Sequence, residues 1–371
     1  MWADFHWHAR DWQESHKETV KRSLELAYVS GGLAIGAMPN TQPALNTLDI
    51  CRDYLKLADG ITVPNEKRMI PVQLYVHIGL TADLEQVKCA VEATRKEPGI
   101  CGMKVYWGSS TGTLGIFRTE DQYNVLETLA KEGYTGVVVS HCEKEELLHD
   151  DTYDPQYPET WSTLCRPERA EIVSFQELVG YAEKVNFCGK IHVAHVSTLP
   201  VVDLVAAYQG PLQLSCGVTP HHLFLDSNYL NREDGAWYKC NPPLRNKETQ
   251  QGLLERVMQG KIPIIESDHA PHTVEDKQKI LPASGIASGL LWPETIANLK
   301  SNGMNQQQLK AVCFENAVTL YGLQERIRYE ERKIQPQVLE KLQSEYPYRS
   351  FANFFSRGNS RDNSRGDSHE S

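Results

Sequence analysis

The sequence predicts a closed (β/α)8 barrel of the α/β class. Short runs rich in β-branched residues alternate with amphipathic stretches through most of the 371 residues, which is the pattern of parallel strands joined by helices. Eight such pairs fit within this length, as a (β/α)8 barrel requires. The strand candidates are residues 2–8, 33–38, 70–80, 100–106, 135–141, 190–196, 212–217 and 262–268.

Helical periodicity fills the segments between these strands and the segment after the last one. We expect the barrel to occupy residues 1–325, followed by a C-terminal extension over 326–355 in which a helix can form. Ser, Arg, Asn, Gly and Asp dominate the end of the chain, so we expect a disordered tail over 356–371. The helix candidates are residues 16–30, 43–58, 83–97, 121–132, 168–185, 199–208, 247–259 and 306–321.

Composition excludes several classes of protein. A net charge of −10, with no basic run outside the C-terminal region, argues against a nucleic-acid partner. No apolar stretch approaches the length of a membrane span, and the N-terminus lacks the features of a signal peptide, so we expect no membrane partner and a cytoplasmic location. The nine cysteines are dispersed singly and indicate reduced thiols.

The stretch DFHWHAR at residues 4–10 places a polar side chain at every second position. A strand alternates its two faces, so these side chains share one side of the first strand. Two imidazoles two residues apart on such a face can hold a metal ion, although histidine pairs also occur as ordinary surface residues. The side chains that share this face are Asp4, His6, His8 and Arg10.

Polar residues also close the later strands, whose C-terminal ends share one face of a barrel. Taken singly, such residues mostly satisfy the loop backbone; several together, nearly all of metal-ligand or acid–base type, predict a functional site. Imidazole and carboxylate donors without suitably spaced cysteines favour a catalytic zinc site over a structural one. The strand-end residues are His8, Asn40, Lys104, His141, His195 and Asp268.

Lys104 is the unexpected member of this set. A lysine inside a barrel is costly unless its charge is neutralised, so one reading is a salt-bridged or snorkelling side chain. The other reading is a carbamate: CO₂ adds to a neutral amine and gives an anionic oxygen donor that can bridge two metal ions.

Eight motifs together resemble the binuclear amidohydrolase superfamily and, within it, the dihydroorotases. They occur in that family's order and span residues 4 to about 320. Longer members carry a small β-sandwich, and we expect this barrel to lack it. The motifs are HxHxRD (6–11), MPNTQP (38–43), GMKVY (102–106), SHCEKEE (140–146), AHVST (194–198), TPHHLFL (219–225), NPPLR (241–245) and SDHAPH (267–272).

The resemblance implies a zinc-dependent cyclic amide hydrolase with two divalent metal ions, and N-carboxylated Lys104 as their bridging ligand. It also implies that Asp268 is catalytic and carries a proton from the attacking water to the ring nitrogen. The implied reaction is the reversible cyclisation of N-carbamoyl-L-aspartate to L-dihydroorotate in pyrimidine biosynthesis. The residues that match metal ligands are His6, His8, Lys104, His141, His195 and Asp268.

Further matches concern the substrate. Arg10, Asn40 and His272 resemble the clamp on the substrate's carboxylate, which an arginine fork recognises through two parallel hydrogen bonds. Asn241 resembles a further contact, and the backbone at Ser284 and Gly285 resembles the contact with the pyrimidine ring.

Two alternatives remain open beside this interpretation. Allantoinase or dihydropyrimidinase would share the metal set, but their substrates lack the ring carboxylate that the clamp recognises. A catalytically dead barrel could instead serve as a subunit of a pyrimidine-synthesis complex. We also expect a homodimer or an association with other enzymes of that pathway. His192, His221 and His222 match no ligand position, so packing or support of the ligands is expected for them.

Overall fold

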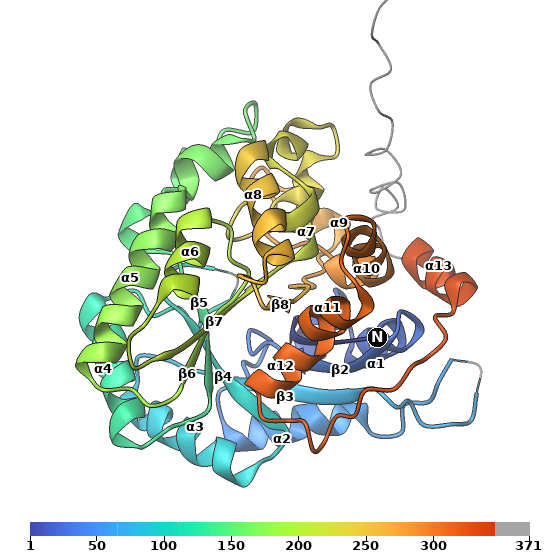
Figure 1. Ribbon diagram of the computed structural model, residues 1–371, viewed down its shortest axis with the longest axis horizontal. Coiled ribbons are helices and arrows are strands. Elements are labelled where there is room, and N and C mark those ends of the chain that lie inside the picture. Colours follow the sequence, from blue (N-terminus) through green and yellow to red (C-terminus); the bar gives the residue numbers. More distant parts are fainter. Residues whose placement is uncertain (65, 111, 346–371) are drawn as a thin grey trace, which may run out of the picture.

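The computed structural model describes residues 1–64, 66–110 and 112–345. In this part of the chain, eight parallel strands form one sheet in sequence order and curl into a nearly closed barrel (Figure 1), which confirms the predicted fold class. The strands are β1 (Trp2–Trp7), β2 (Gly32–Ala37), β3 (Gln73–Gly79), β4 (Ile100–Tyr106), β5 (Val137–His141), β6 (Lys190–Val193), β7 (Gln213–Val218) and β8 (Ile264–Ile265).

The barrel closes between its last and first strands through single contacts instead of a regular ladder. The backbone N–H of His8 donates to the carbonyl oxygen of His269 at 2.8 Å, and the N–H of Ser267 donates to the Asp4 carboxylate at 3.0 Å. β8 is shorter than the predicted strand over 262–268, and Asp268 has a left-handed backbone with φ of 47°. The chain therefore leaves the sheet just where the predicted site begins.

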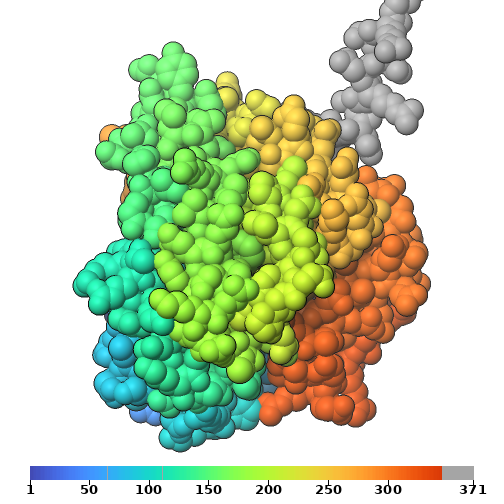
Figure 2. All heavy atoms as spheres, turned by 60° about the vertical axis from the view of Figure 1, so that its left-hand side comes forward, coloured from blue at the N-terminus to red at the C-terminus, as the bar shows by residue number. Residues whose placement is uncertain are grey.

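Helices surround the strands (Figure 1), and from one side their atoms pack into a continuous wall that hides the barrel (Figure 2). They are α1 (Val20–Val29), α2 (Leu48–Leu55), α3 (Leu84–Lys96), α4 (Thr119–Lys131), α5 (Glu168–Lys184), α6 (Leu199–Ala207), α7 (Pro220–Phe224), α8 (Lys247–Met258), α9 (Val274–Lys277), α10 (Trp292–Ser301), α11 (Gln306–Lys310), α12 (Asn316–Leu320) and α13 (Pro336–Glu345).

Capping residues explain why two helices begin later than predicted. The Thr19 hydroxyl accepts a hydrogen bond from the backbone N–H of Arg22, and the Thr47 hydroxyl accepts one from Ile50. Each cap satisfies an N–H that has no partner within the helix, so α1 and α2 start after these threonines. The predicted helix over 306–321 is interrupted by a π-helical turn at Ala311–Glu315, which separates α11 from α12.

Three tryptophans anchor the first strand in the core. Trp2 stacks on Trp7 and on Trp292, with ring centroids 5.8 and 4.8 Å apart. The indole N–H groups are also satisfied: Trp7 donates to the Ser23 hydroxyl, and Trp292 donates to the buried Asp4 carboxylate. Large buried aromatic surfaces with paired polar atoms hold β1 rigidly, and β1 carries the predicted metal ligand His6 and leads directly into His8.

The end of the described chain returns to the start of the barrel. The N–H of Gln335 donates to the carbonyl oxygen of Val29 at 3.1 Å, and α13 packs beside α1. The predicted tail over 356–371 lies outside the described residues, as does the part of the extension beyond residue 345. Among the described residues, no helix has the length and apolar character needed to cross a membrane.

Candidate active site

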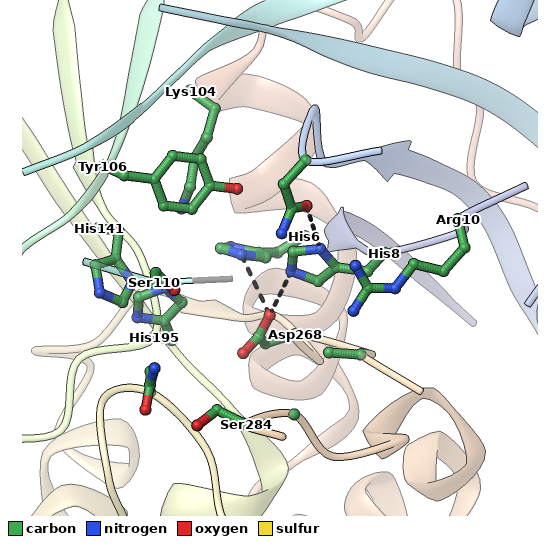
Figure 3. A pocket seen from close by; sticks show the side chains of 14 residues that line it. His6, His8, Arg10, Lys104, Tyr106, Ser110, His141, His195, Asp268 and Ser284 are labelled. Carbon is green, nitrogen blue, oxygen red and sulfur yellow. Dashed lines mark hydrogen bonds and ion pairs between the residues drawn. The ribbon is translucent and has the colours of Figure 1, made fainter. Parts of the chain in front are cut away.

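A cavity opens among the C-terminal ends of the strands and the loops that follow them (Figure 3). It gathers residues from positions 6 to 285 of the chain, as expected if the barrel brings its strand ends to one face. Eleven of the twelve predicted site residues line it: His6, His8, Arg10, Asn40, Lys104, His141, His195, Asn241, Asp268, Ser284 and Gly285.

One wall of the cavity combines the two histidines of the first motif with Asp268. Oδ1 of Asp268 lies 3.4 Å from His6 Nε2 and 3.0 Å from His8 Nε2, and the potential ligand atoms of the three residues lie within 4.8 Å of one another. His8 is oriented from behind, because its Nδ1 lies 2.7 Å from the Asn40 amide oxygen. Such a contact aims Nε2 at the cavity and fixes the imidazole tautomer.

The opposite wall carries His141, at the end of β5, and His195, just after β6. Nδ1 of His141 lies 3.2 Å from Nε2 of His195. On its other side, His141 Nε2 lies 2.9 Å from the Glu143 carboxylate, which also accepts from Arg166 Nη1 at 2.6 Å. Burial lowers the pKa of both imidazoles, so each ring is neutral near pH 7 and has one lone pair to offer a cation.

Lys104 lies between these walls, on β4. Its side chain is fully buried, and Nζ has no hydrogen-bond partner in the structure and lies 4.9 Å from the centroid of the Tyr106 ring. Burial lowers the pKa of Lys104 to about 8. About a tenth of the amine is therefore neutral near pH 7, and a neutral amine is the form that reacts with CO₂.

Three site residues have left-handed backbones. Values of φ are 60° at Arg10, 41° at His195 and 47° at Asp268, in a region that residues other than glycine seldom adopt. β1 ends at Trp7, so the direction of Arg10 comes from this turn and not from simple strand alternation as predicted. The Arg10 side chain is 1% exposed, and its Nε and Nη1 lack hydrogen-bond partners.

The remaining predicted residues form the outer wall. Asn241 Oδ1 is buried without a hydrogen-bond partner. Gly285 has φ of 149°, and a Cβ there would lie 2.6 Å from the carbonyl oxygen of Ala270, so glycine is required for this close approach. His272 does not line the cavity. Its Nε2 lies 2.9 Å from the carbonyl oxygen of Ser284, and it supports the wall from outside.

Sequence reasoning missed four residues of this site. Tyr106, Ser110 and Ala270 line the cavity, and the buried Tyr106 hydroxyl has no hydrogen-bond partner. Glu266 lies behind the ligands, where its carboxylate accepts from the His195 N–H at 2.6 Å and lies near His6 and His192. Strand alternation could have identified two of the four residues, because Tyr106 follows Lys104 by two positions and Glu266 precedes Asp268 by two.

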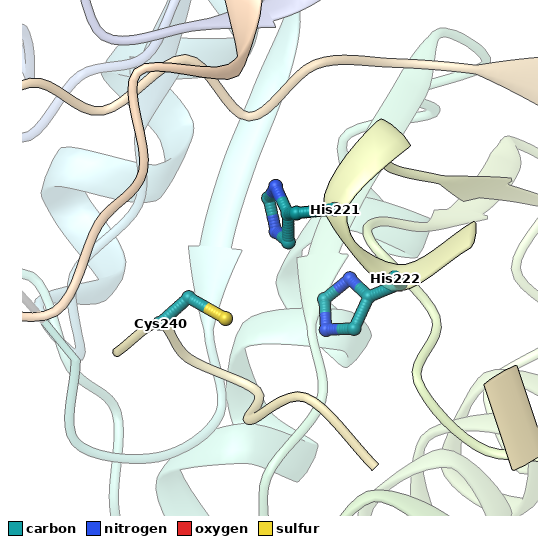
Figure 4. A group of neighbouring side chains, drawn as sticks. All are labelled: His221, His222 and Cys240. Atoms are coloured by element: carbon teal, nitrogen blue, oxygen red, sulfur yellow. The ribbon is translucent and has the colours of Figure 1, made fainter. Parts of the chain in front are cut away.

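A second group of potential ligands lies outside the cavity (Figure 4). The side chains of His221, His222 and Cys240 are buried and close enough to share an ion. Both nitrogens of His222 are engaged, one with the Thr219 hydroxyl at 2.8 Å and the other with the carbonyl oxygen of Pro242 at 3.1 Å. His221 Nδ1 lies 2.6 Å from the Ser288 hydroxyl, whereas its Nε2 is buried without a hydrogen-bond partner among the described residues. The packing role expected for the two histidines stays a prediction.

Known proteins resemble this chain over most of its length. No family model matches it. The dihydroorotase of Pyrobaculum aerophilum is 30% identical over 286 residues, which cover 77% of this chain and 63% of that protein. The chain is a homologue of the dihydroorotases. It spans less than two thirds of the length of this relative.

Solved structures agree on the fold of this dihydroorotase homologue. The L-hydantoinase (dihydropyrimidinase) of Arthrobacter aurescens superposes with a TM-score of 0.76 at 22% identity, over 88% of this chain and 72% of that one. The dihydroorotase of Campylobacter jejuni gives a TM-score of 0.64 at 19% identity, over 90% and 85% of the two chains. The chain therefore shares its barrel fold with these two enzymes.

Proposed function

We propose that this dihydroorotase homologue is itself a dihydroorotase, which interconverts N-carbamoyl-L-aspartate and L-dihydroorotate with the help of two divalent metal ions. The observation that carries the proposal is the cavity itself. It combines a cluster of imidazoles and one carboxylate with the buried Arg10, whose Nε and Nη1 have no hydrogen-bond partner among the described residues and whose Nη1 lies 3.8 Å from the Glu14 carboxylate. The barrel over residues 1–325 is the unit that would carry this site.

The side chains around the cavity fit a pair of cations. Lys104 Nζ and His195 Nδ1 are buried without hydrogen-bond partners, and the facing atoms of His6, His8 and Asp268 lie within 4.8 Å of one another. His141 and His195 would hold one ion and the first-strand histidines with Asp268 the other, with carboxylated Lys104 between them. When bound, divalent cations such as Zn²⁺ lower the pKa of water and polarise a carbonyl group.

Asp268 is the group that would move the proton. Burial raises the pKa of its carboxyl, but the contact with His8 and the nearby His6 outweigh this effect and hold the pKa below its usual value. The carboxylate is therefore ionised and can accept a proton as water adds to the ring carbonyl. When the C–N bond breaks, the same carboxyl can deliver that proton to the departing nitrogen.

Arg10 would select the substrate. An arginine fork pairs with a carboxylate through two hydrogen bonds, and L-dihydroorotate carries such a group while dihydrouracil and allantoin do not. Asn40 lies beside the same part of the cavity, and His272 holds the backbone of Ser284 in place. Asn241 offers an amide with a free oxygen to the ring, next to the backbone at Gly285.

The test is the hydrolysis of L-dihydroorotate by the purified chain, followed by absorbance, with dihydrouracil, allantoin and a hydantoin as competing substrates. We expect turnover of dihydroorotate alone, and loss of turnover after treatment with a chelator. Turnover of dihydrouracil or hydantoin instead would assign the barrel to the other cyclic amide hydrolases. Absence of turnover with metal bound would support an inactive subunit. The homodimer, the association with pathway enzymes and the cytoplasmic location stay predictions.

A further inference from the structure

A second cavity lies outside the active site, between the loop before α5, the segment before Asn241 and the loop after α9. Its lining includes Trp161, Arg232, Trp237, Lys239 and Lys277. None of these residues lines the active-site cavity, and none matches a motif residue that the proposed function uses. We call this second cavity the dilysine pocket, after Lys239 and Lys277.

The two lysines of the dilysine pocket are almost completely buried, with 3% and 1% of their surface exposed. Lys239 Nζ donates to the Ser284 hydroxyl at 2.6 Å and lies 3.3 Å from the centroid of the Trp161 ring. Lys277 Nζ donates to the backbone oxygen of Lys239 at 3.2 Å. Each ammonium group has three donors, so hydrogen-bonding capacity remains on both nitrogens.

Neither lysine has a counter-ion among the described residues, although carboxylates are close by. The Asp150 carboxylate accepts from Nε and Nη2 of Arg166, at 3.0 and 2.8 Å. Asp234 accepts from Arg232 at 2.8 Å, and Asp276 accepts from Lys279 at 2.7 Å. These three acidic groups are thus paired with other cations, while the exposed Glu233, which also lines the pocket, forms no ion pair with either lysine. Burying two ammonium groups without an anion is costly, so burial lowers the pKa of both lysines. A bound anion would remove that cost and hold both amines in their protonated form.

We propose that the dilysine pocket binds a phosphate group, either free phosphate or the phosphate of a small ester. Two ammonium groups match the double negative charge of a phosphate, for which lysine serves as a point-charge partner. Arg232 also lines the pocket, where its charge is already paired with Asp234. A bound phosphate would also be linked to the active site, because Lys239 donates to the Ser284 hydroxyl and Ser284 lines the active-site cavity.

The experiment titrates the full chain with inorganic phosphate by calorimetry, in chloride buffer at constant ionic strength. We expect saturable binding to the wild type. The variant K277M should bind phosphate about 10-fold more weakly or worse, since a charge-assisted hydrogen bond is lost. K277R keeps the charge and should retain binding. The matched control is K131M, which removes an exposed lysine on α4 and should bind like the wild type.

A parallel titration with a nucleoside monophosphate identifies the source of the group: tighter binding than phosphate indicates an ester, and equal binding indicates free phosphate. Equal binding of phosphate to the wild type and to K277M would place the phosphate site elsewhere, for example beside Arg10. This result would overturn the proposal. Absence of saturable binding to the wild type would overturn it as well. Phosphate binding is measured independently of turnover. Failure of the phosphate proposal can therefore be distinguished from failure of the proposed activity.

Discussion

Two buried groups in this barrel have the composition and spacing of metal ligands, yet their surroundings differ. The group of His6, His8 and Asp268 faces the cavity at the strand ends. The group of His221, His222 and Cys240 is equally compact, but its members do not line that cavity. Distances between ligand atoms therefore do not separate the two groups.

Position beside the cavity, taken together with hydrogen bonding, separates them. Both nitrogens of His222 have protein partners, and Cys240 Sγ donates to the carbonyl oxygen of Pro242. His221 Nε2 lacks a partner among the described residues, but His221 does not line the cavity. Burial also raises the pKa of Cys240 to about 12, so the thiol stays protonated and is a poor ligand. Around the first group, Lys104 Nζ and His195 Nδ1 lack partners. Unsatisfied donor atoms beside an open space distinguish a site from a packed cluster.

The largest effect is expected at Asp268. The substitution Asp268→Asn removes the base while keeping the size of the side chain, so kcat for dihydroorotate should fall by about 10³-fold or more. Steady-state kinetics with circular dichroism as the folding control provide the measurement. Cys240→Ser is the matched change in the second group and should leave kcat within about twofold. Equal losses in the two variants would remove the distinction between the groups.

A smaller effect is expected at Arg10. In Arg10→Met the substrate carboxylate loses its charged partner, so KM should rise about 10- to 100-fold while bound metal is unchanged. The preference for dihydroorotate over dihydrouracil should shrink by the same factor. Competition assays with both substrates measure it. A KM that does not change would show that another group binds the carboxylate.

A substitution in the group of His221, His222 and Cys240 should lower stability without changing the metal content of the protein. His222→Gln breaks at least one buried hydrogen bond, at a cost of about 1–3 kcal/mol in the free energy of unfolding. Denaturant titration measures the loss, and elemental analysis should find the same metal content as in the wild type. A variant of His222 that loses metal at unchanged stability would instead make this group a metal site.

Buried Lys277 extends the comparison to a third position, where the effect is a gradual change of stability with pH. Burial lowers its pKa to about 7 in the folded chain, against 10.5 for a free lysine. Between these values the unfolded chain holds a proton that the folded chain lacks, so stability relative to Lys277→Met rises with pH, by at most about 1.4 kcal/mol per unit. Below pH 7 the difference levels off.

Denaturant titrations of both proteins between pH 7.5 and 9.5, in phosphate-free buffer, provide the measurement. A stability difference that stays constant across this range would mean that Lys277 remains protonated in the folded chain. It would also mean that a partner inside the protein already neutralises its charge.

The sequence predicts those residues of the site that lie at the ends of strands. Alternation in a strand and the shared face of a barrel account for His6, His8, Lys104 and His141, since periodicity alone places them. Arg10 faces the cavity through a left-handed turn that no periodicity encodes.

Side chains that depend on loop conformation could not be placed in the same way. Lys239 meets Ser284 through contacts between segments 45 residues apart, and His272 lies outside the wall that it supports. Similarly, the π-helical turn at Ala311–Glu315 divides a segment whose apolar pattern reads as one helix. In each of these places tertiary packing overrides the local pattern.

The most direct test is a metal titration of the chelator-treated chain, with dihydroorotate hydrolysis followed after each addition of Zn²⁺. The cavity with its two histidine walls predicts no activity without metal and a plateau near two equivalents per chain. Full activity in the metal-free chain, or none after two equivalents have bound, would contradict the central claim that this barrel is a metal-dependent dihydroorotase.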